Sequence, residues 1–224
     1  MKLGIAVYHK NIHVYQSEWI TKCMESIMHN CSKCHQYGGN DFAIVLFELD
    51  YGGGPNAAFF KGYDEQFYRH ISQSHALPNY AAAMNYVYDK LFFEYDCDVV
   101  ANINVDDYYN ANRFIFLLDS LEIRADIASS NYILIGEQGQ EIRRTDFTGL
   151  DVETELARGN NIVSNPCHMM KRRVFEKLQF NPDLVPVEDL EYWQRCLKEK
   201  FRIFIAPEYL HYYRVHPKQS GNFP

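Results

Sequence analysis

The chain has 224 residues, 47% of them apolar and 23% charged, which is the ordinary balance of a soluble folded protein. A chain of this length is predicted to form one domain and to bury a core that needs neither disulfides nor metal. Its 22 basic and 29 acidic residues give a net charge of −7. This charge argues against duplex nucleic acid or an anionic membrane as the main partner, because few cations are left for phosphate contacts.

No targeting or membrane-spanning segment is predicted. The apolar residues 3–8 are too few for a secretory signal, and the longest apolar run, Phe42 to Phe47, is far shorter than the ~20 residues of a membrane span. We therefore expect a cytoplasmic protein without an integral membrane segment. Its six cysteines are expected to be reduced in such a compartment.

In chain order, the first half predicts a strand over 3–8, a helix from Ser17 to Met28, a polar loop at 38–39, a strand over 42–49, a glycine-rich loop over 51–55, a helix capped by Asn79 and a strand over 99–105. The helices are indicated by apolar residues at i, i+3, i+4 and i+7 behind a capping residue. The strand over 42–49 is indicated by a continuous apolar run, typical of a strand buried on both faces.

The second half continues with a helix capped by Asn110 or Asn112, a strand over 126–135, a polar loop over 143–161, a short helix at 174–178, a helix after Pro186, and two short strands over 202–206 and 211–215. This alternation predicts an α/β fold with a central, mixed and mostly parallel sheet flanked by helices.

Residues 31–35, Cys-Ser-Lys-Cys-His, spell the attachment pattern of c-type haem. Haem attachment normally follows export, which nothing in the sequence indicates. Zinc is an alternative, with His29 or Cys23 as further ligands, but no second ligand pair completes the site. We interpret the segment as an ordinary loop.

Residues 104–107, Asn-Val-Asp-Asp, follow an apolar strand. Open α/β sheets bind ligands at the carboxyl ends of their strands. Adjacent oxygen ligands there suit Mg²⁺ or Mn²⁺, completed by substrate phosphates and water. Paired acids also serve simply to cap the following helix, so Asp106 and Asp107 have a structural alternative.

Two further groups of residues are candidates for chemistry. Glu188 and Asp189 fall in a first helical turn, where the helix dipole keeps a general base ionised. The alternative is that the two acids only stabilise the helix dipole. Near the end, strand alternation places Arg214 and His216 on one face, suited to a diphosphate or a metal, while a simple hydrogen-bonding role is the alternative for His216.

The motifs of several other enzyme classes are missing. No Gly-x-Gly-x-x-Gly follows the first strand, the glycines at 52–54 lack the lysine of a P-loop, and no Gly-x-Ser-x-Gly elbow occurs.

The order of these signals resembles a family 2 glycosyltransferase of the GT-A fold over nearly the whole chain. The matching segments are Ala-Val-Tyr-His at 6–9, Cys-Met-Glu-Ser-Ile at 23–27, Glu-Leu-Asp-Tyr at 48–51, Ala-Ala-Ala-Met-Asn at 81–85, Asn-Val-Asp-Asp at 104–107, the strand at 126–132, Met-Met-Lys-Arg-Arg at 169–173, Glu-Asp at 188–189 and Tyr-Arg-Val-His at 213–216. Met84 stands where the family has an arginine, and Asn104 stands where its first aspartate is usual.

The resemblance implies a metal-assisted, inverting enzyme that uses a nucleotide-sugar, most often a UDP-sugar, and moves the sugar to an acceptor hydroxyl. Donor-binding residues would be Tyr8, Glu48, Asp50, Asn79, Asn104, Asp106 and Arg214. Mn²⁺ or Mg²⁺ would be held by Asp106, Asp107 and His216. Asp189 would be the general base, with Glu188 beside it. The single domain, 1–224, would bind the donor through about residues 1–110 and the acceptor through about 111–224. Trp193 and Tyr132 would pack on sugar rings, and packing in the core is an equal alternative for Trp193.

Two alternatives remain open. A silent GT-A scaffold that binds nucleotide or glycan without transfer is favoured by Met84 and Asn104, whereas Asp106, Asp189 and His216 favour an enzyme. A sugar nucleotidyltransferase would need a glycine-rich phosphate loop after the first strand, and residues 8–11 contain no glycine.

Overall fold

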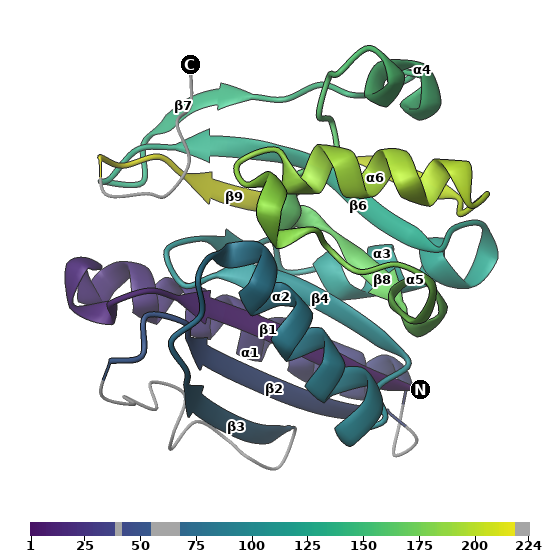
Figure 1. The fold of residues 1–224 in the computed structure, drawn as a ribbon. Coiled ribbons are helices and arrows are strands. Elements are labelled where there is room, and N and C mark those ends of the chain that lie inside the picture. Colours follow the sequence, from purple (N-terminus) through teal and green to yellow (C-terminus); the bar gives the residue numbers. More distant parts are fainter. Residues whose placement is uncertain (39–41, 55–67, 218–224) are drawn as a thin grey trace.

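The computed structural model describes residues 1–38, 42–54 and 68–217. The described strands form one nine-stranded sheet in the order β3-β2-β1-β4-β8-β6-β9-β5, with β7 paired to β6 (Figure 1). Their bounds are β1 Lys2–His9, β2 Ala43–Asp50, β3 Arg69–Ser74, β4 Val99–Asn104, β5 Tyr108–Tyr109, β6 Ile127–Ile135, β7 Glu141–Arg144, β8 Met169–Lys171 and β9 Ile203–Arg214.

The helices are α1 Ser17–Gly38, α2 Tyr80–Asp89 with its π-helical continuation η3 Lys90–Glu94, α3 Arg113–Ile123, α4 Val152–Ala157, α5 Arg172–Lys177 and α6 Glu188–Lys198; short 3₁₀ turns are η1 Ile12–Val14, η4 Asn165–Cys167 and η5 Pro182–Leu184. Among helices in the described ranges, none is both long and apolar enough to cross a membrane.

The sheet is mixed. β1 lies between β2 and β4, and both neighbours run parallel to it, as does β3 to β2. Beyond β4 the short strand β8 is antiparallel to both β4 and β6, and a long parallel ladder then joins β6 to β9. Register pairs Tyr8 with Asn104 and His9 with Asp50, so the carboxyl ends of β1, β2 and β4 meet at one edge.

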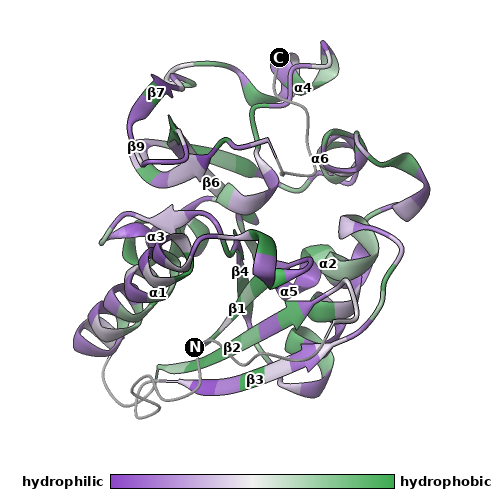
Figure 2. Cartoon of the chain, turned by 90° about the vertical axis from the view of Figure 1, so that its left-hand side faces the viewer, coloured by the Kyte–Doolittle hydropathy of each residue, from purple (hydrophilic) through white to green (hydrophobic). Residues whose placement is uncertain are grey.

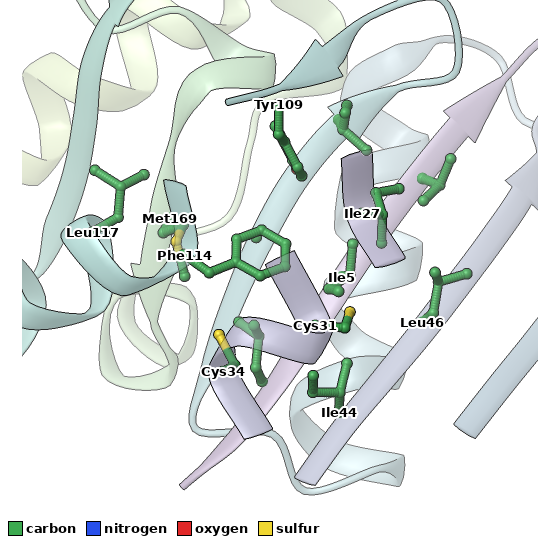
Figure 3. Close-up of a cluster of buried hydrophobic side chains, with 14 of the residues drawn as sticks. Ile5, Ile27, Cys31, Cys34, Ile44, Leu46, Tyr109, Phe114, Leu117 and Met169 are labelled. Atoms are coloured by element: carbon green, nitrogen blue, oxygen red, sulfur yellow. The ribbon is translucent and has the colours of Figure 1, made fainter. Parts of the chain in front are cut away.

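Helices cover both faces of the sheet and bury a core on each. In the side-on view α1 and α3 lie on one face, and α2 lies on the other together with α5 and α6 (Figure 2). The first core includes Ile27 and Cys31 of α1, packed against Ile5 and Leu46 of the sheet (Figure 3). The second core is rich in aromatic residues from α2, α5 and α6. The strands between the two cores are apolar on both faces, which explains the continuous apolar runs of β1 and β2.

These findings confirm the predicted α/β fold with a mixed sheet flanked by helices. The Asn79 cap is also confirmed, because its side-chain oxygen accepts the amide of Ala82 at 3.0 Å. Asn112 lies at the α3 cap position without a side-chain capping bond. Of the predicted loops, residues 39 and 55 lie outside the described residues.

Several expectations were wrong. Helix α1 does not end near Met28, so residues 31–35 are helical rather than a loop, because Cys31 and Cys34 extend the apolar face of the helix into the core. The segment 143–161 is not all loop: it contains the end of β7 and helix α4. The two short terminal strands are one strand, β9, whose register shifts relative to β6 near Pro207.

Candidate functional site

The carboxylate of Asp106 lies beside the ring of His216. After β4 the chain turns, and Asp106 Oδ2 is 2.8 Å from His216 Nε2. Both residues are nearly buried, with exposed fractions of 8% and 5%. The ring of Trp19 lies 5.0 Å from that of His216, and Tyr15 approaches it edge-on at 6.1 Å. Aromatic rings from the amino end of the chain therefore hold this imidazole against the carboxylate.

The neighbouring carboxylate, Asp107, is engaged inside the protein. Its Oδ1 accepts the backbone amide of Arg214 at 2.7 Å, and its Oδ2 lies 3.2 Å from Nε2 of the fully buried His211. Burial raises the pKa of Asp107, and the charge of Asp106 raises it further, while the Arg214 amide acts in the opposite direction. Asp107 thus fastens the turn after β4 to β9.

The guanidinium of Arg214 is also held by the protein itself. Its Nε donates to the carbonyl of Asp106 at 2.9 Å, and its Nη1 donates to the carbonyls of Gly136 and Glu137 at 2.9 and 3.1 Å. Its plane lies over the ring of Trp19, at 4.8 Å. Arg214 therefore joins the Asp106 turn, the β6–β7 turn and α1, and it remains a prediction that the residue contacts the donor.

A divalent cation fits this place in part. Within the described ranges no three His, Cys, Asp or Glu side chains gather as a metal-ligand set. However, Asp106 and His216 supply one carboxylate oxygen and one imidazole nitrogen at the same point, and Mn²⁺ accepts both ligand types. Cations that act on diphosphates commonly take only one or two protein ligands, because phosphate oxygens and water complete the coordination.

At the ends of β1 and β2, the buried carboxylate of Glu48 lies between two imidazoles. Its Oε1 is 3.4 Å from His9 Nε2, and its Oε2 is 3.1 Å from His70 Nε2. Asp50, two residues on, accepts the amide of Gly52 at 2.8 Å. The ring of Tyr8 is buried on the opposite side of β1 from these groups, in the second core.

The two predicted asparagines have structural partners. Asn79 donates from Nδ2 to the carbonyl of Pro182, in addition to capping α2. The Asn104 side chain lowers the pKa of Asp107, which places it beside that carboxylate. Two residues before Asn104, the fully buried Asn102 donates to the hydroxyl of Tyr80 at 3.1 Å.

At the start of α6, Asp189 is half-buried and its two oxygens have different partners. Oδ1 accepts the amide of Leu190 at 2.8 Å, and Oδ2 accepts the side-chain amide of Asn161 at 2.7 Å. Burial raises the pKa of Asp189, and these hydrogen bonds oppose that rise. The preceding Glu188 has its pKa raised by burial and by the charge of Asp189.

Two tyrosines connect the Asp106 turn with Asp189. Tyr213 of β9 and Tyr132 of β6 have ring centroids 6.0 Å apart. The charges of Asp107 and Asp106 act on Tyr213, and the charge of Asp189 acts on Tyr132. Tyr213 therefore lies near the Asp106 turn, and Tyr132 beside it lies near Asp189.

Sequence reasoning missed several of these neighbours. His9, His70 and His211 were assigned no role, since each is a single histidine whose neighbouring carboxylate is distant in sequence. Trp193 is fully buried, with its Nε1 donating to the carbonyl of Val163 at 2.7 Å, so it belongs to the core and does not stack on a sugar.

A separate pocket of about 510 Å³ lies at the opposite edge of the sheet. The residues that line it include Met1, Val99, Leu118 and Lys171. Met1 and Val99 lie at the amino ends of β1 and β4. None of the predicted site residues lines this pocket.

No protein-family model and no curated protein sequence matches the chain. The structure is similar to that of Staphylococcus aureus TarS 1–349 in complex with UDP-GlcNAc, with a TM-score of 0.61 and 12% identity, covering 100% of this chain and 62% of that chain. It is also similar to the mannosyltransferase PcManGT from Pyrobaculum calidifontis in complex with GDP-Man and Mn²⁺, with a TM-score of 0.64 and 12% identity, covering 96% of this chain and 57% of that chain.

The likeness establishes the fold: the chain has the Rossmann-like α/β fold of these glycosyltransferases, as predicted. The chain spans about three fifths of the length of each of these two neighbours.

Proposed function

We propose that the protein is an inverting glycosyltransferase of family 2, which moves a sugar from a nucleotide-diphosphate donor, a UDP-sugar first among the candidates, to an acceptor hydroxyl. The observation that carries the proposal is the close pair of Asp106 and His216 near Tyr213, with Asp189 near the adjoining Tyr132. The neighbours of the same fold, solved with UDP-GlcNAc and with GDP-Man and Mn²⁺, support it.

The donor would lie along the carboxyl ends of β1, β2 and β4. Glu48 or Asp50 would face the base, with Tyr8 and Asn79 supporting this end of the site, and Asn104 would face the ribose. Asp106 and His216 would hold Mn²⁺ or Mg²⁺, which when bound supplies a Lewis acid for the departing diphosphate. Asp107 is assigned a supporting part, because its oxygens face Arg214 and His211.

Asp189 would act on the acceptor. As the acceptor oxygen forms its bond to the anomeric carbon, its proton passes to the Asp189 carboxylate. The bond from the anomeric carbon to the donor phosphate breaks, and its electron pair leaves with the nucleoside diphosphate. Help of this kind contributes about 10²–10⁴ in rate. Glu188 beside it is a buried acid whose pKa is raised by burial and by the charge of Asp189, because like charges oppose one another.

The test is slow hydrolysis of a panel of nucleotide-sugars by the purified chain, measured with Mn²⁺ and again with EDTA. We expect metal-dependent release of the nucleoside diphosphate from one donor, which also identifies the sugar. The Asp106→Ala variant should lose this release, and the exposed carboxylate variant Asp119→Ala should keep it.

Release from no donor, together with a UDP-dependent rise in melting temperature, would favour the silent binder. If no nucleotide-sugar releases a nucleoside diphosphate, and neither UDP nor GDP raises the melting temperature of the chain, the proposal is wrong.

A further inference from the structure

Asn161 approaches Asp189 from outside α6. It precedes η4 by a few residues, and its Nδ2 donates to Asp189 Oδ2 at 2.7 Å across 28 positions of sequence. The amide of Asn161 is itself oriented, because its Oδ1 accepts the backbone amide of Val163 at 3.3 Å. A side-chain amide with both ends bonded has one orientation, so the oxygen of Asp189 that it contacts is fixed as well.

The segment that carries Asn161 is bound to α6 at two further points. Trp193 donates from Nε1 to the carbonyl of Val163 at 2.7 Å, and Gln194 donates from Nε2 to the carbonyl of Leu156 at 2.7 Å. Trp193 is fully buried in the second core. Because these bonds lie on both sides of Asn161 in the sequence, the segment has little freedom to move away from the helix.

We propose that Asn161 is the positioning residue for Asp189: it fixes Oδ2, and with it the direction in which the carboxylate meets an acceptor hydroxyl. This inference rests on the proposed function. A catalytic carboxylate is effective when hydrogen bonds from supporting residues hold it within a fraction of an ångström of the reactive position. Misplacement of about 1 Å costs up to about 10²-fold in rate.

The surroundings of Asp189 make this contact matter for ionisation. Glu188 is adjacent on α6, and the charge of Asp189 raises the pKa of Glu188. Tyr132 of β6 feels the charge of Asp189 and is neutral, because burial raises its pKa. Burial raises the pKa of Asp189 itself, and the opposing contributions come from the Leu190 amide and from Asn161. Asn161 is thus a side-chain donor that favours the ionised base.

The test compares Asn161→Ala with the matched variant Asn160→Ala. Asn160 is the neighbouring asparagine, and its side chain bonds Glu155 instead of Asp189. In Asn161→Ala we expect kcat to fall about 10-fold with KM for the donor unchanged. The acid limb of the pH profile should move up by about one pH unit, because a hydrogen bond to the ionised form is lost. Asn160→Ala should behave as the wild type. In Asn161→Asp the limb should move further, because a second carboxylate faces the first.

A second measurement does not depend on turnover. Carbon-13 NMR titration of the Asp189 carboxyl, assigned by its absence in Asp189→Asn, should show the same upward shift of its pKa in Asn161→Ala. An unchanged titration, or equal pH profiles for the two alanine variants, overturns the role of Asn161. A shifted titration in a protein that transfers no sugar leaves this contact standing and rejects the proposed function.

Discussion

Asp106 Oδ2 and His216 Nε2 lie 2.8 Å apart although 110 positions separate the two residues in sequence. One lies in the turn after β4, and the other follows β9. A carboxylate and an imidazole that meet so far from each other in sequence are held by tertiary structure, and the ring contacts with Trp19 and Tyr15 show how.

If this pair holds the cation, removing either member should weaken Mn²⁺-dependent UDP binding. We expect a loss of about 10–100-fold in affinity for His216→Ala and at least as much for Asp106→Ala, because a metal site with few protein ligands depends on each. Isothermal titration with UDP, with Mn²⁺ and with EDTA, measures it. Equal affinity in His216→Ala and wild type would remove His216 from the metal site.

The Asp189→Asn substitution should separate binding from transfer. The amide cannot take a proton from the acceptor, so turnover should fall by about 10²–10⁴. Donor affinity should stay near that of the wild type, since the proposed metal ligands are Asp106 and His216 and not Asp189. Single-turnover transfer and UDP titration measure the two effects. Wild-type turnover in this variant would show that Asp189 is not the base.

Arg214→Met should mainly lower stability. The substitution removes the donors to the carbonyls of Asp106, Gly136 and Glu137, of which Gly136 keeps a bond from the Gly139 amide and Glu137 keeps a bond from Trp19 Nε1. We expect a loss of about 3 kcal/mol in the free energy of unfolding, measured in urea. Arg144→Met is the control, because Arg144 forms an exposed pair with Glu141 and should cost less than about 1 kcal/mol. Similar costs for both variants would contradict the tying role of Arg214.

His168 predicts how stability depends on pH. Burial lowers its pKa to about 3, whereas an unfolded histidine titrates near 6.5. Between these values the unfolded chain binds a proton that the folded chain does not, so the free energy of unfolding falls as the pH is lowered from about 6.5 towards 3.

Between pH 6 and pH 5, the free energy of unfolding should therefore change less steeply with pH in His168→Gln than in the wild type. The expected difference between the two slopes is about 1.4 kcal/mol per pH unit. Urea unfolding at each pH gives the slopes. His211, whose pKa burial also lowers, contributes equally to both proteins. Parallel slopes would mean that His168 is protonated in the folded chain.

The six cysteine thiols are expected to react slowly with thiol reagents in the native protein. All six are buried free thiols, and burial raises the pKa of Cys34 to about 12. Reaction with an aromatic disulfide reagent at pH 8 should be at least about 100-fold slower in the native protein than in urea. Fast reaction of two thiols in the native state would show that the end of α1 around Cys31 and Cys34 opens.

Periodicity predicted most of the fold because buried strands and amphipathic helices carry their signal locally. β3 was missed because Arg69–Ser74 is polar and only partly buried, so it has no apolar run. β9 was divided in two because Pro207 interrupts its pattern. In the structure Pro207 lies where the register to β6 shifts, and its carbonyl accepts Nδ2 of Asn131 at 3.0 Å.

The candidate site was predictable only where residues lie at strand or helix ends. Asp106 follows a buried strand, and Asp189 lies in a first helical turn, so both were visible in the sequence. Asn161 was not, because its contact joins a segment without periodicity to a helix 28 positions later. Pairings of this kind are fixed by packing of Trp193 and its neighbours, which no local pattern records.

The position of β9 sets an order of events during synthesis. This strand pairs with both β6 and β5, and it brings Arg214 and His216 to Asp106. A ribosome-bound chain that has emerged only as far as α6 can form the ladders β1–β2 and β1–β4, but β5 then lacks its partner strand. The surroundings of Asp106 are consequently complete only after most of the chain has been synthesised. An amino-terminal fragment ending at α6 should therefore bind no UDP–Mn²⁺, even if its helices and first strands fold.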